Sequence, residues 1–116
     1  MFKGLRTVIY HVNNIEEAKK WYSSILDIPP YFDQAYYVGF NVKGFELGLD
    51  PNSDGVTKGN NVVGYWMVDN VQSVLKDLLE KGAKLNTDVQ DVGEGIKVAT
   101  VLDPYGNIFG IMDEPV

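Results

Sequence analysis

One order of secondary-structure signals occurs twice along the chain, and this repeat limits the folds that the sequence can adopt. VNNIEEA at 12–18 matches VDNVQSV at 68–74, an offset of 68 − 12 = 56 residues. In each copy the matched segment follows a run of β-branched and aromatic residues typical of a strand, and it opens an apolar pattern of helical period. FELGL at 45–49 also corresponds in pattern to FGIMD at 109–113. Each half therefore predicts a strand, a helix and then several strands, which is a βαβββ module.

Two helices are predicted from their capping residues and their apolar faces. Asn14 is a good N-cap for the first helix, and the pair Pro29–Pro30 ends it because proline cannot continue a helix. Asn70 caps the second helix, and Gly82 is placed for a left-handed C-cap. The apolar faces consist of Ile15, Ala18, Trp21, Tyr22, Ile25 and Leu26 in the first helix, and of Val71, Val74, Leu75, Leu78 and Leu79 in the second.

Strands are predicted on both sides of the helices. The turn DPYG at 103–106 has Asp, Pro and Gly at the positions that a type I turn favours. Residues 51–61 are rich in Gly, Asn, Asp and Ser and are predicted to form a loop. The predicted strands are 6–12, 35–42, 44–50, 62–68, 96–102 and 107–112, with PPYF at 29–32 as a further edge-strand candidate. We therefore expect an α+β fold in a single domain, 1–116, with module one at about 1–55 and module two at about 61–116.

Composition and charge exclude several classes of function. The net charge is −6 and the ten basic residues are scattered, which disfavours nucleic acid and anionic membranes as partners. No apolar run approaches the roughly 20 residues that span a bilayer. The opening MFKGLRTVIYHV lacks the pattern of a signal peptide, so a cytoplasmic location is expected. The chain has no cysteine and a single histidine, His11, which excludes thiolate chemistry and a multi-histidine zinc site within one chain.

Three segments resemble the vicinal oxygen chelate superfamily, which includes glyoxalase I, bleomycin-resistance proteins and extradiol dioxygenases. They are VIYHVNNIEEAKKWYSSILDI, VGYWMVDNVQSVLKDLLEKGAKL and VLDPYGNIFGIMD. The resemblance implies that the two modules form a cupped mixed sheet, with a helix on the outer side of each module, and that paired modules enclose a cavity. It also implies a homodimer, because the family usually pairs four modules around two cavities.

Catalytic members of this family hold one divalent metal with ligands from four strand positions. Carried onto this sequence, those positions are Thr7, Glu46, Val63 and Gly110. Only Glu46 offers a strong ligand, whereas a catalytic zinc ion needs about three protein ligands. The resemblance therefore predicts a member without the usual metal site and with no cofactor. This points away from a glyoxalase-type isomerase and from an extradiol dioxygenase.

Strand alternation predicts which side chains line the cavity. Thr7, Ile9 and His11 share one face of their strand, and alternation gives Glu46 the same orientation on its own strand. Such a surface suits an apolar or aromatic small organic molecule, oriented by His11 and Glu46. Each residue also has a purely structural interpretation: Glu46 as a solvated strand residue, and His11 as a hydrogen-bonding surface group. The predicted ligand-binding residues are Ile9, His11, Glu46, Val63, Tyr65, Met67 and Met112.

Three classes of function follow. The first is a metal-independent small-molecule-binding protein that sequesters or senses its ligand. The second is a lyase, isomerase or dioxygenase-like enzyme, either with a metal on non-standard ligands such as Glu46, His11 and Asp50, or metal-free with His11 and Glu46 transferring protons. The third is a module that makes only protein contacts, with its cavity filled by its own side chains. Glu46→Gln should leave much of the ligand binding intact in the first class and should abolish turnover in the second, whereas the third class should bind no ligand.

Overall fold

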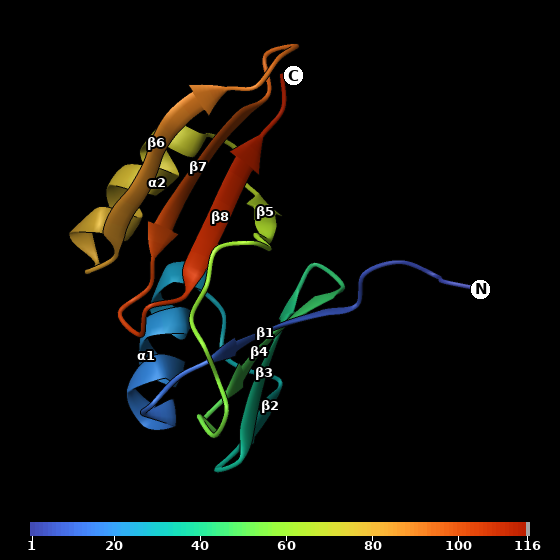
Figure 1. Ribbon diagram of the computed structural model, residues 1–116, viewed down its shortest axis with the longest axis vertical. Coiled ribbons are helices and arrows are strands. Elements are labelled where there is room, and N and C mark those ends of the chain that lie inside the picture. The colour runs from blue at the N-terminus through green and yellow to red at the C-terminus, as the bar shows by residue number, and fades with distance from the viewer. Residues whose placement is uncertain (116) are drawn as a thin grey trace. The chain divides into compact units, whose positions relative to one another are not determined.

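The computed structural model describes residues 1–115 and divides into two compact units, Met1–Val56 and the part from Thr57 onward. Each unit contains one helix and one four-stranded mixed sheet (Figure 1). This confirms the predicted α+β class and the two-module layout. Neither helix in the described part of the chain has the length and apolar character needed to cross a membrane.

The first unit follows the order of the predicted module. Its elements are β1 (Thr7–His11), α1 (Ile15–Leu26), β2 (Phe32–Gln34), β3 (Tyr37–Val42) and β4 (Phe45–Asp50). The sheet order is β1-β4-β3-β2, with β1 parallel to β4 and the other pairs antiparallel. The candidate edge strand near PPYF is present as β2, two or three residues later than predicted, because Pro29 and Pro30 cannot supply ladder N–H groups.

The second unit repeats this topology. Its elements are β5 (Tyr65–Met67), α2 (Val71–Glu80), β6 (Lys84–Asp91), β7 (Lys97–Leu102) and β8 (Ile108–Asp113), and its sheet order is β5-β8-β7-β6. β5 is shorter than the predicted strand at 62–68. β6 was not predicted as a strand from its residues, because KLNTDVQD is mostly polar and exposed, and irregularities interrupt its pairing with β7.

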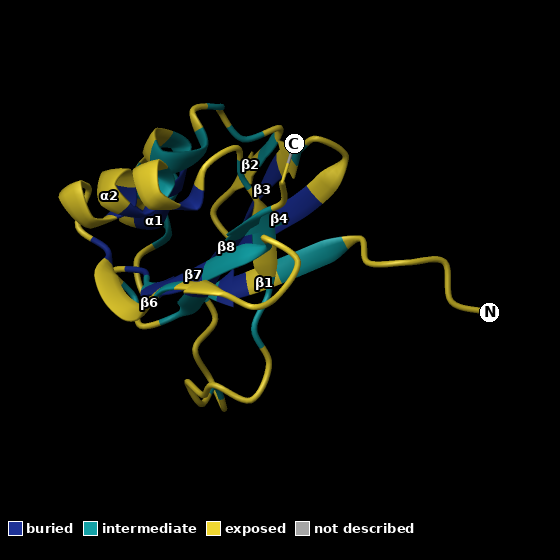
Figure 2. Cartoon of the chain, turned by 90° about the horizontal axis from the view of Figure 1, so that it is seen from above, coloured by how far each residue is buried: buried dark blue, intermediate teal, exposed yellow. Residues whose placement is uncertain are grey.

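One face of each sheet packs against the helix of its own unit. In the first unit Phe40, Leu47 and Leu49 are fully buried beneath α1, together with Tyr22 of the helix. Figure 2 shows buried segments along β3 and β4. Trp66 lies on the helix-facing side of the second sheet, where its ring stacks on Phe109 at 6.4 Å. The opposite face of each sheet carries no helix of its own unit, and the predicted site residues that belong to strands lie there.

The caps explain where both helices begin and where the second ends. The side chains of Asn14 and Asn70 accept hydrogen bonds from the backbone N–H groups of Glu17 (3.1 Å) and Ser73 (2.9 Å). At the end of α2, Gly82 has φ = 106° and its N–H bonds to the Leu79 carbonyl, while the next N–H reaches the Leu78 carbonyl. This is a Schellman motif, and it confirms the C-cap predicted at Gly82.

The predicted turn after β7 is built around one buried carboxylate. Asp103 is 3% exposed, and its Oδ1 accepts backbone N–H bonds from Tyr105 (2.9 Å) and Asn107 (2.8 Å). Asn107 also donates from its side chain to Asp103 Oδ2 at 2.9 Å and accepts from Lys58 at 2.6 Å. The motif DPYGN therefore acts as a rigid corner, which turns the chain so that β8 runs back antiparallel to β7.

Backbone hydrogen bonds correct the correspondence between FELGL and FGIMD. The N–H of Val12 bonds to the Asp50 carbonyl, and that of Val68 bonds to the Met112 carbonyl. Since Val12 and Val68 each lie two residues before a helix cap, Asp50 corresponds to Met112 in the repeat. Counting back along both strands makes Ile108 the counterpart of Glu46, and Gly110 the counterpart of Gly48. The pattern match was wrong by two residues.

Replacing Asn70 with alanine tests the cap. Asn70→Ala leaves the Ser73 N–H without its acceptor, so we expect the free energy of unfolding to fall by about 1 kcal/mol. Asn70→Asp is the matched control, because aspartate caps a helix equally well and should preserve stability. Urea unfolding followed by circular dichroism measures both. Equal stability of the alanine and aspartate variants would contradict the role of the cap.

Candidate functional site

Glu46 is a buried carboxylate on the helix-free face of the first sheet. Its neighbours in register are Thr7 on β1 and Asn41 on β3, and the residue is only 9% exposed. A buried charge needs hydrogen-bonding partners, because the desolvation cost is otherwise several kcal/mol. The interpretation of Glu46 as a solvated residue on the surface of its strand is therefore wrong.

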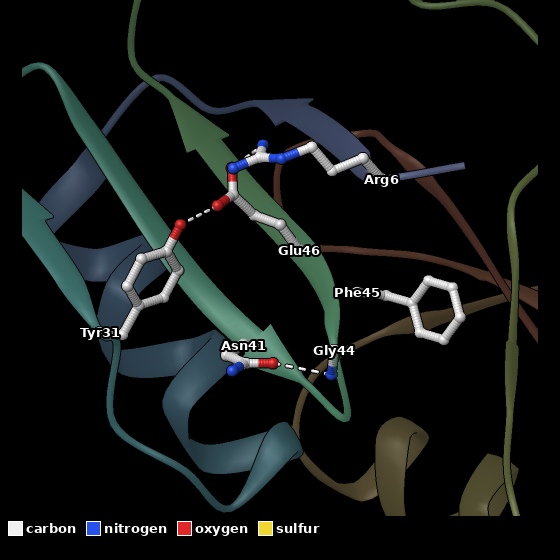
Figure 3. A pocket seen from close by; sticks show the side chains of 6 residues that line it. All are labelled: Arg6, Tyr31, Asn41, Gly44, Phe45 and Glu46. Carbon is white, nitrogen blue, oxygen red and sulfur yellow. Dashed lines mark hydrogen bonds and ion pairs between the residues drawn. The ribbon is translucent and has the colours of Figure 1, made fainter. Parts of the chain in front are cut away.

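Two tyrosines supply those partners. The Tyr31 hydroxyl donates to Oε1 of Glu46, and the Tyr37 hydroxyl donates to Oε2 at 2.5 Å. The Arg6 guanidinium lies farther off, with Nη1 3.8 Å from Oε2, and its side chain is 79% exposed (Figure 3). The carboxylate is thus held by two neutral donors at hydrogen-bond distance and by one loosely paired cation.

Glycines make room for this arrangement on the sheet. A Cβ atom on Gly48 would overlap the Tyr37 hydroxyl and lie 2.6 Å from its Cζ atom. A Cβ atom on Gly39, the register partner of Gly48, would lie 3.2 Å from Cε1 of Tyr31. Both glycines have backbone angles that any residue can adopt, so their value here is the absence of a side chain. The rings of Tyr31 and Tyr37 can therefore lie close to the strands.

The pKa values of these groups shift in the directions that the contacts dictate. Burial acts to raise the pKa of Glu46, but the hydrogen bonds from Tyr31 and Tyr37, with the Arg6 charge, outweigh it and hold that pKa below its ordinary value. Burial, followed by the hydrogen bond to Glu46, raises the pKa of Tyr37. The hydrogen bond to Glu46 is the main cause that raises the pKa of Tyr31. At neutral pH the cluster therefore contains a carboxylate and two protonated phenols.

A small pocket opens beside this cluster. Its volume is about 190 Å³. Figure 3 shows Tyr31, Glu46 and Asn41 around its opening, with Arg6 above the carboxylate. Polar groups border much of it, which differs from the mostly apolar lining that strand alternation predicted. The complete lining is Arg6, Tyr31, Asn41, Gly44, Phe45 and Glu46.

His11 shares the face of Glu46 but lies far from it. The strand register pairs Glu46 with Thr7, and His11 with Asp50, so four residues or roughly 13 Å of strand separate the two side chains. Nδ1 of His11 lies 2.9 Å from the carbonyl oxygen of Asn52 and must donate, because a carbonyl oxygen only accepts. The hypothesised His11–Glu46 dyad is therefore wrong within this chain. His11 fastens the loop that follows β4.

The predicted residues of the second module share one face of the second sheet, except Val63. Tyr65 pairs with Gly110, and Met67 with Met112, so these four lie on the helix-free face. Tyr65 is 43% exposed and Met67 is 57% exposed. Ile9, on the equivalent face of the first sheet, is 48% exposed. Val63 precedes β5 and is half-buried in an irregular segment. Whether any of these residues contacts a ligand stays a prediction.

The donor set at the four family positions does not fit a divalent metal ion. Val63 and Gly110 have no donor side chain, and neither has Ile108, which the strand register makes the counterpart of Glu46. The hydroxyl of Thr7 lies 2.7 Å from Arg6 Nη1, which donates to it. Each oxygen of Glu46 already accepts a phenolic hydrogen bond. Among residues 1–115 no cluster of three or more His, Cys, Asp or Glu side chains could hold a metal. A single carboxylate falls short of the ligand number that hard or borderline cations need.

The sequence did not single out four residues of this site. Arg6 and Tyr31 fall within the predicted strands 6–12 and 29–32, but they precede the observed β1 and β2, so strand alternation does not fix their orientation. Asn41 lies on β3, within the predicted strand 35–42, which was given no inward face. Tyr37 lies on the same strand and was not singled out either. Its alternation with Val38 and Phe40 in the core could have indicated that it lies on the Glu46 face.

Known structures share this architecture at low sequence identity. A glyoxalase-related enzyme from Fulvimarina pelagi matches with a TM-score of 0.80 and 18% identity, over 99% of this chain and 91% of its own. A glyoxalase/bleomycin resistance protein/dioxygenase family enzyme from Burkholderia phytofirmans matches with a TM-score of 0.81 and 16% identity, over 97% of this chain and 100% of its own. A genomically encoded fosfomycin resistance protein from Listeria monocytogenes matches with a TM-score of 0.81 and 11% identity, over 100% of this chain and 97% of its own. No family model matches the sequence, and no curated protein does.

Replacing Gly48 with alanine tests the packing beneath Tyr37. We expect Gly48→Ala to push the Tyr37 hydroxyl away from Glu46 and to lower the free energy of unfolding by about 1–3 kcal/mol, as overpacking commonly does. Gly59→Ala is the control, because its nearest neighbour would be the Asn61 side chain at 3.8 Å. Chemical denaturation compares the two variants. A Gly48→Ala protein as stable as Gly59→Ala would contradict the close approach.

The low pKa of Glu46 makes stability depend on pH in a defined direction. Its folded-state pKa lies below the ordinary 4.5, so its contribution is present above that value and is lost as the pH falls through the folded-state pKa. We expect the difference in unfolding free energy between the native protein and Glu46→Gln to be largest near neutral pH and to shrink in acid. Urea unfolding along a pH series measures it.

A second variant shows whether the phenols cause this behaviour. In the double variant Tyr31→Phe, Tyr37→Phe the carboxylate keeps its burial but loses both hydroxyl donors. The pKa of Glu46 should then rise, so acid destabilisation should begin at a higher pH than in the native protein. An unchanged pH profile would show that the two phenols do not stabilise the carboxylate.

Proposed function

We propose that this chain, which has the vicinal oxygen chelate fold, is a metal-independent protein that binds a small organic molecule on the helix-free face of its sheets. Ligand sequestration or sensing would then be its role, with no resident cofactor. The fold is shared with enzymes and with a resistance protein, so the fold alone does not choose among functions. The choice depends on the chemistry around Glu46.

One observation carries the proposal: the only carboxylate at the four family positions already accepts a phenolic hydrogen bond on each of its oxygens. These two bonds fix the orientation of the carboxylate and lower its basicity, which disfavours the role of a general base, and no second metal-ligating side chain lies at the other family positions. The lowered pKa of Glu46 thus makes it a weak base. These features support a binding site with a fixed hydrogen-bonding pattern.

The enzymatic alternatives receive less support from the geometry. A metal held by Glu46, His11 and Asp50 would need the three side chains to converge, but the register places Glu46 roughly 13 Å along the strands from the other two. Proton transfer between His11 and Glu46 meets the same obstacle. Nδ1 of His11 is also bonded to the Asn52 carbonyl, and Oδ1 of Asp50 accepts from the Asn52 N–H.

The proposal includes a homodimer and a cytoplasmic location. Large apolar side chains are exposed on the helix-free face of each sheet, among them Ile9, Tyr65 and Met67. A second copy of the chain would remove such surface from water, at a gain of roughly 25 cal/mol for each Å² buried. Light scattering of the purified protein tests the assembly, and a monomer at all concentrations would contradict it.

Ligand binding in the presence of a chelator tests the central claim. We expect members of a library of small aromatic and polar compounds to shift the amide resonances of residues around Glu46, and EDTA to leave their affinities unchanged. Elemental analysis should find no stoichiometric Mg, Mn, Fe, Co, Ni or Zn. One tightly held metal per chain, lost in Glu46→Gln, would overturn the proposal. A protein that binds no compound would instead support the protein-contact module.

A further inference from the structure

We propose that the pocket beside Glu46 binds a small aromatic carboxylate and that Arg6 is the residue that anchors its negative charge. This inference rests on the proposed function and names the class of its ligand. It assigns a role to a side chain outside the family's metal positions.

The positive charge of Arg6 is only loosely paired with Glu46. Glu46 obtains its two short hydrogen bonds from Tyr31 and Tyr37, and Arg6 stays at 3.8 Å with 79% of its side chain exposed. An exposed pair at that distance contributes little to stability. Nη1 of Arg6 also donates to the Thr7 hydroxyl at 2.7 Å, but a guanidinium has five N–H donors. Arg6 can therefore meet a ligand carboxylate with its remaining donors, because the two phenols keep the charge of Glu46 stabilised. A guanidinium matches a carboxylate with two parallel hydrogen bonds.

A further hydrogen-bond donor, the side-chain amide of Asn41, borders the opening of the pocket. Oδ1 of Asn41 accepts the N–H of Gly44 at 2.8 Å, which fixes the side-chain amide and turns its NH₂ group away from that turn (Figure 3). The neighbouring turn residue, Lys43, adds a positive charge beside Gly44 in the sequence. Of the nearby acids, Asp33 forms its ion pair with Lys19 of α1. The pocket thus offers a cation and an amide donor to an anion.

The pocket is small and has one aromatic wall. Sites for drug-sized ligands measure about 300–1,000 Å³, whereas this pocket holds about 190 Å³. A ligand with a single ring fits that volume. The ring of Tyr31, 60% exposed, forms one wall and offers a face for stacking. A planar ring bearing one carboxylate satisfies both the wall and the cation.

Three compounds of one shape and different charge test the inference: benzoate, benzamide and benzamidine. Each is titrated into ¹⁵N-labelled protein, with the Gly44 and Asn41 amides as local reporters. We expect benzoate to bind most tightly, and its affinity to fall as salt is added. Arg6→Gln should weaken benzoate binding by about tenfold to a hundredfold, since a hydrogen bond to a charged group is lost. Arg6→Lys should retain part of the affinity.

A control variant separates local charge from net charge. Lys20→Gln removes one positive charge from α1, which covers the opposite face of the sheet, and should leave benzoate binding unchanged. Benzamidine binding more tightly than benzoate would overturn the inference, because Glu46 would then govern the pocket. An Arg6→Gln protein with native affinity for benzoate would overturn it too.

The same titrations distinguish this inference from the proposed function. If benzamide or another neutral compound moves the pocket amides and benzoate does not, the inference about carboxylates fails while small-molecule binding stands. If neither these compounds nor the chelator-treated library moves any amide on the helix-free face of the sheet, the proposed function fails and the inference falls with it.

Discussion

The hydrogen bonds from two tyrosine hydroxyls to one buried carboxylate determine what the first module can do. A carboxylate at 9% exposure is costly unless both oxygens are satisfied, and here neutral donors satisfy them. The consequences extend outward from this point. The phenols need glycines beneath them at positions 39 and 48, and the carboxylate no longer requires the arginine above it. Packing, electrostatics and chemistry at this face all follow from one pair of contacts.

The two modules use the same framework for different purposes. Counted from the helix caps, Gly48 and Gly110 occupy equivalent places, and at both a side chain would collide with a tyrosine ring, Tyr37 in one sheet and Tyr65 in the other. At the preceding inward position the first module has Glu46 and the second has Ile108. Both modules therefore place a tyrosine ring against this glycine, but the rings come from non-equivalent strands, β3 and β5, and the polar anchor Glu46 has an apolar counterpart.

The sequence allowed the framework to be predicted better than the site. Caps and turns are local, so Asn14, Asn70, Gly82 and the DPYGN corner could be recognised from a few adjacent residues. Alternation correctly oriented Ile9 and Met67, because both lie inside strands. Arg6 and Tyr31 precede strands, and only the folded chain brings them to Glu46. The distance between His11 and Glu46 depended on the strand register, which no local pattern encodes.

β6 shows how an unremarkable segment protects the sheet that it borders. It is the longest strand of the structure's described residues, and it lies at the edge of its sheet. A flat edge of that length would offer a continuous row of N–H and C=O groups to a passing chain. Register shifts near Thr87 break that row, and Lys84, Asp88 and Asp91 place charge along it. The weak strand pattern of KLNTDVQD thus has a colloidal benefit: charge and irregular pairing at this edge oppose the joining of two copies through β6.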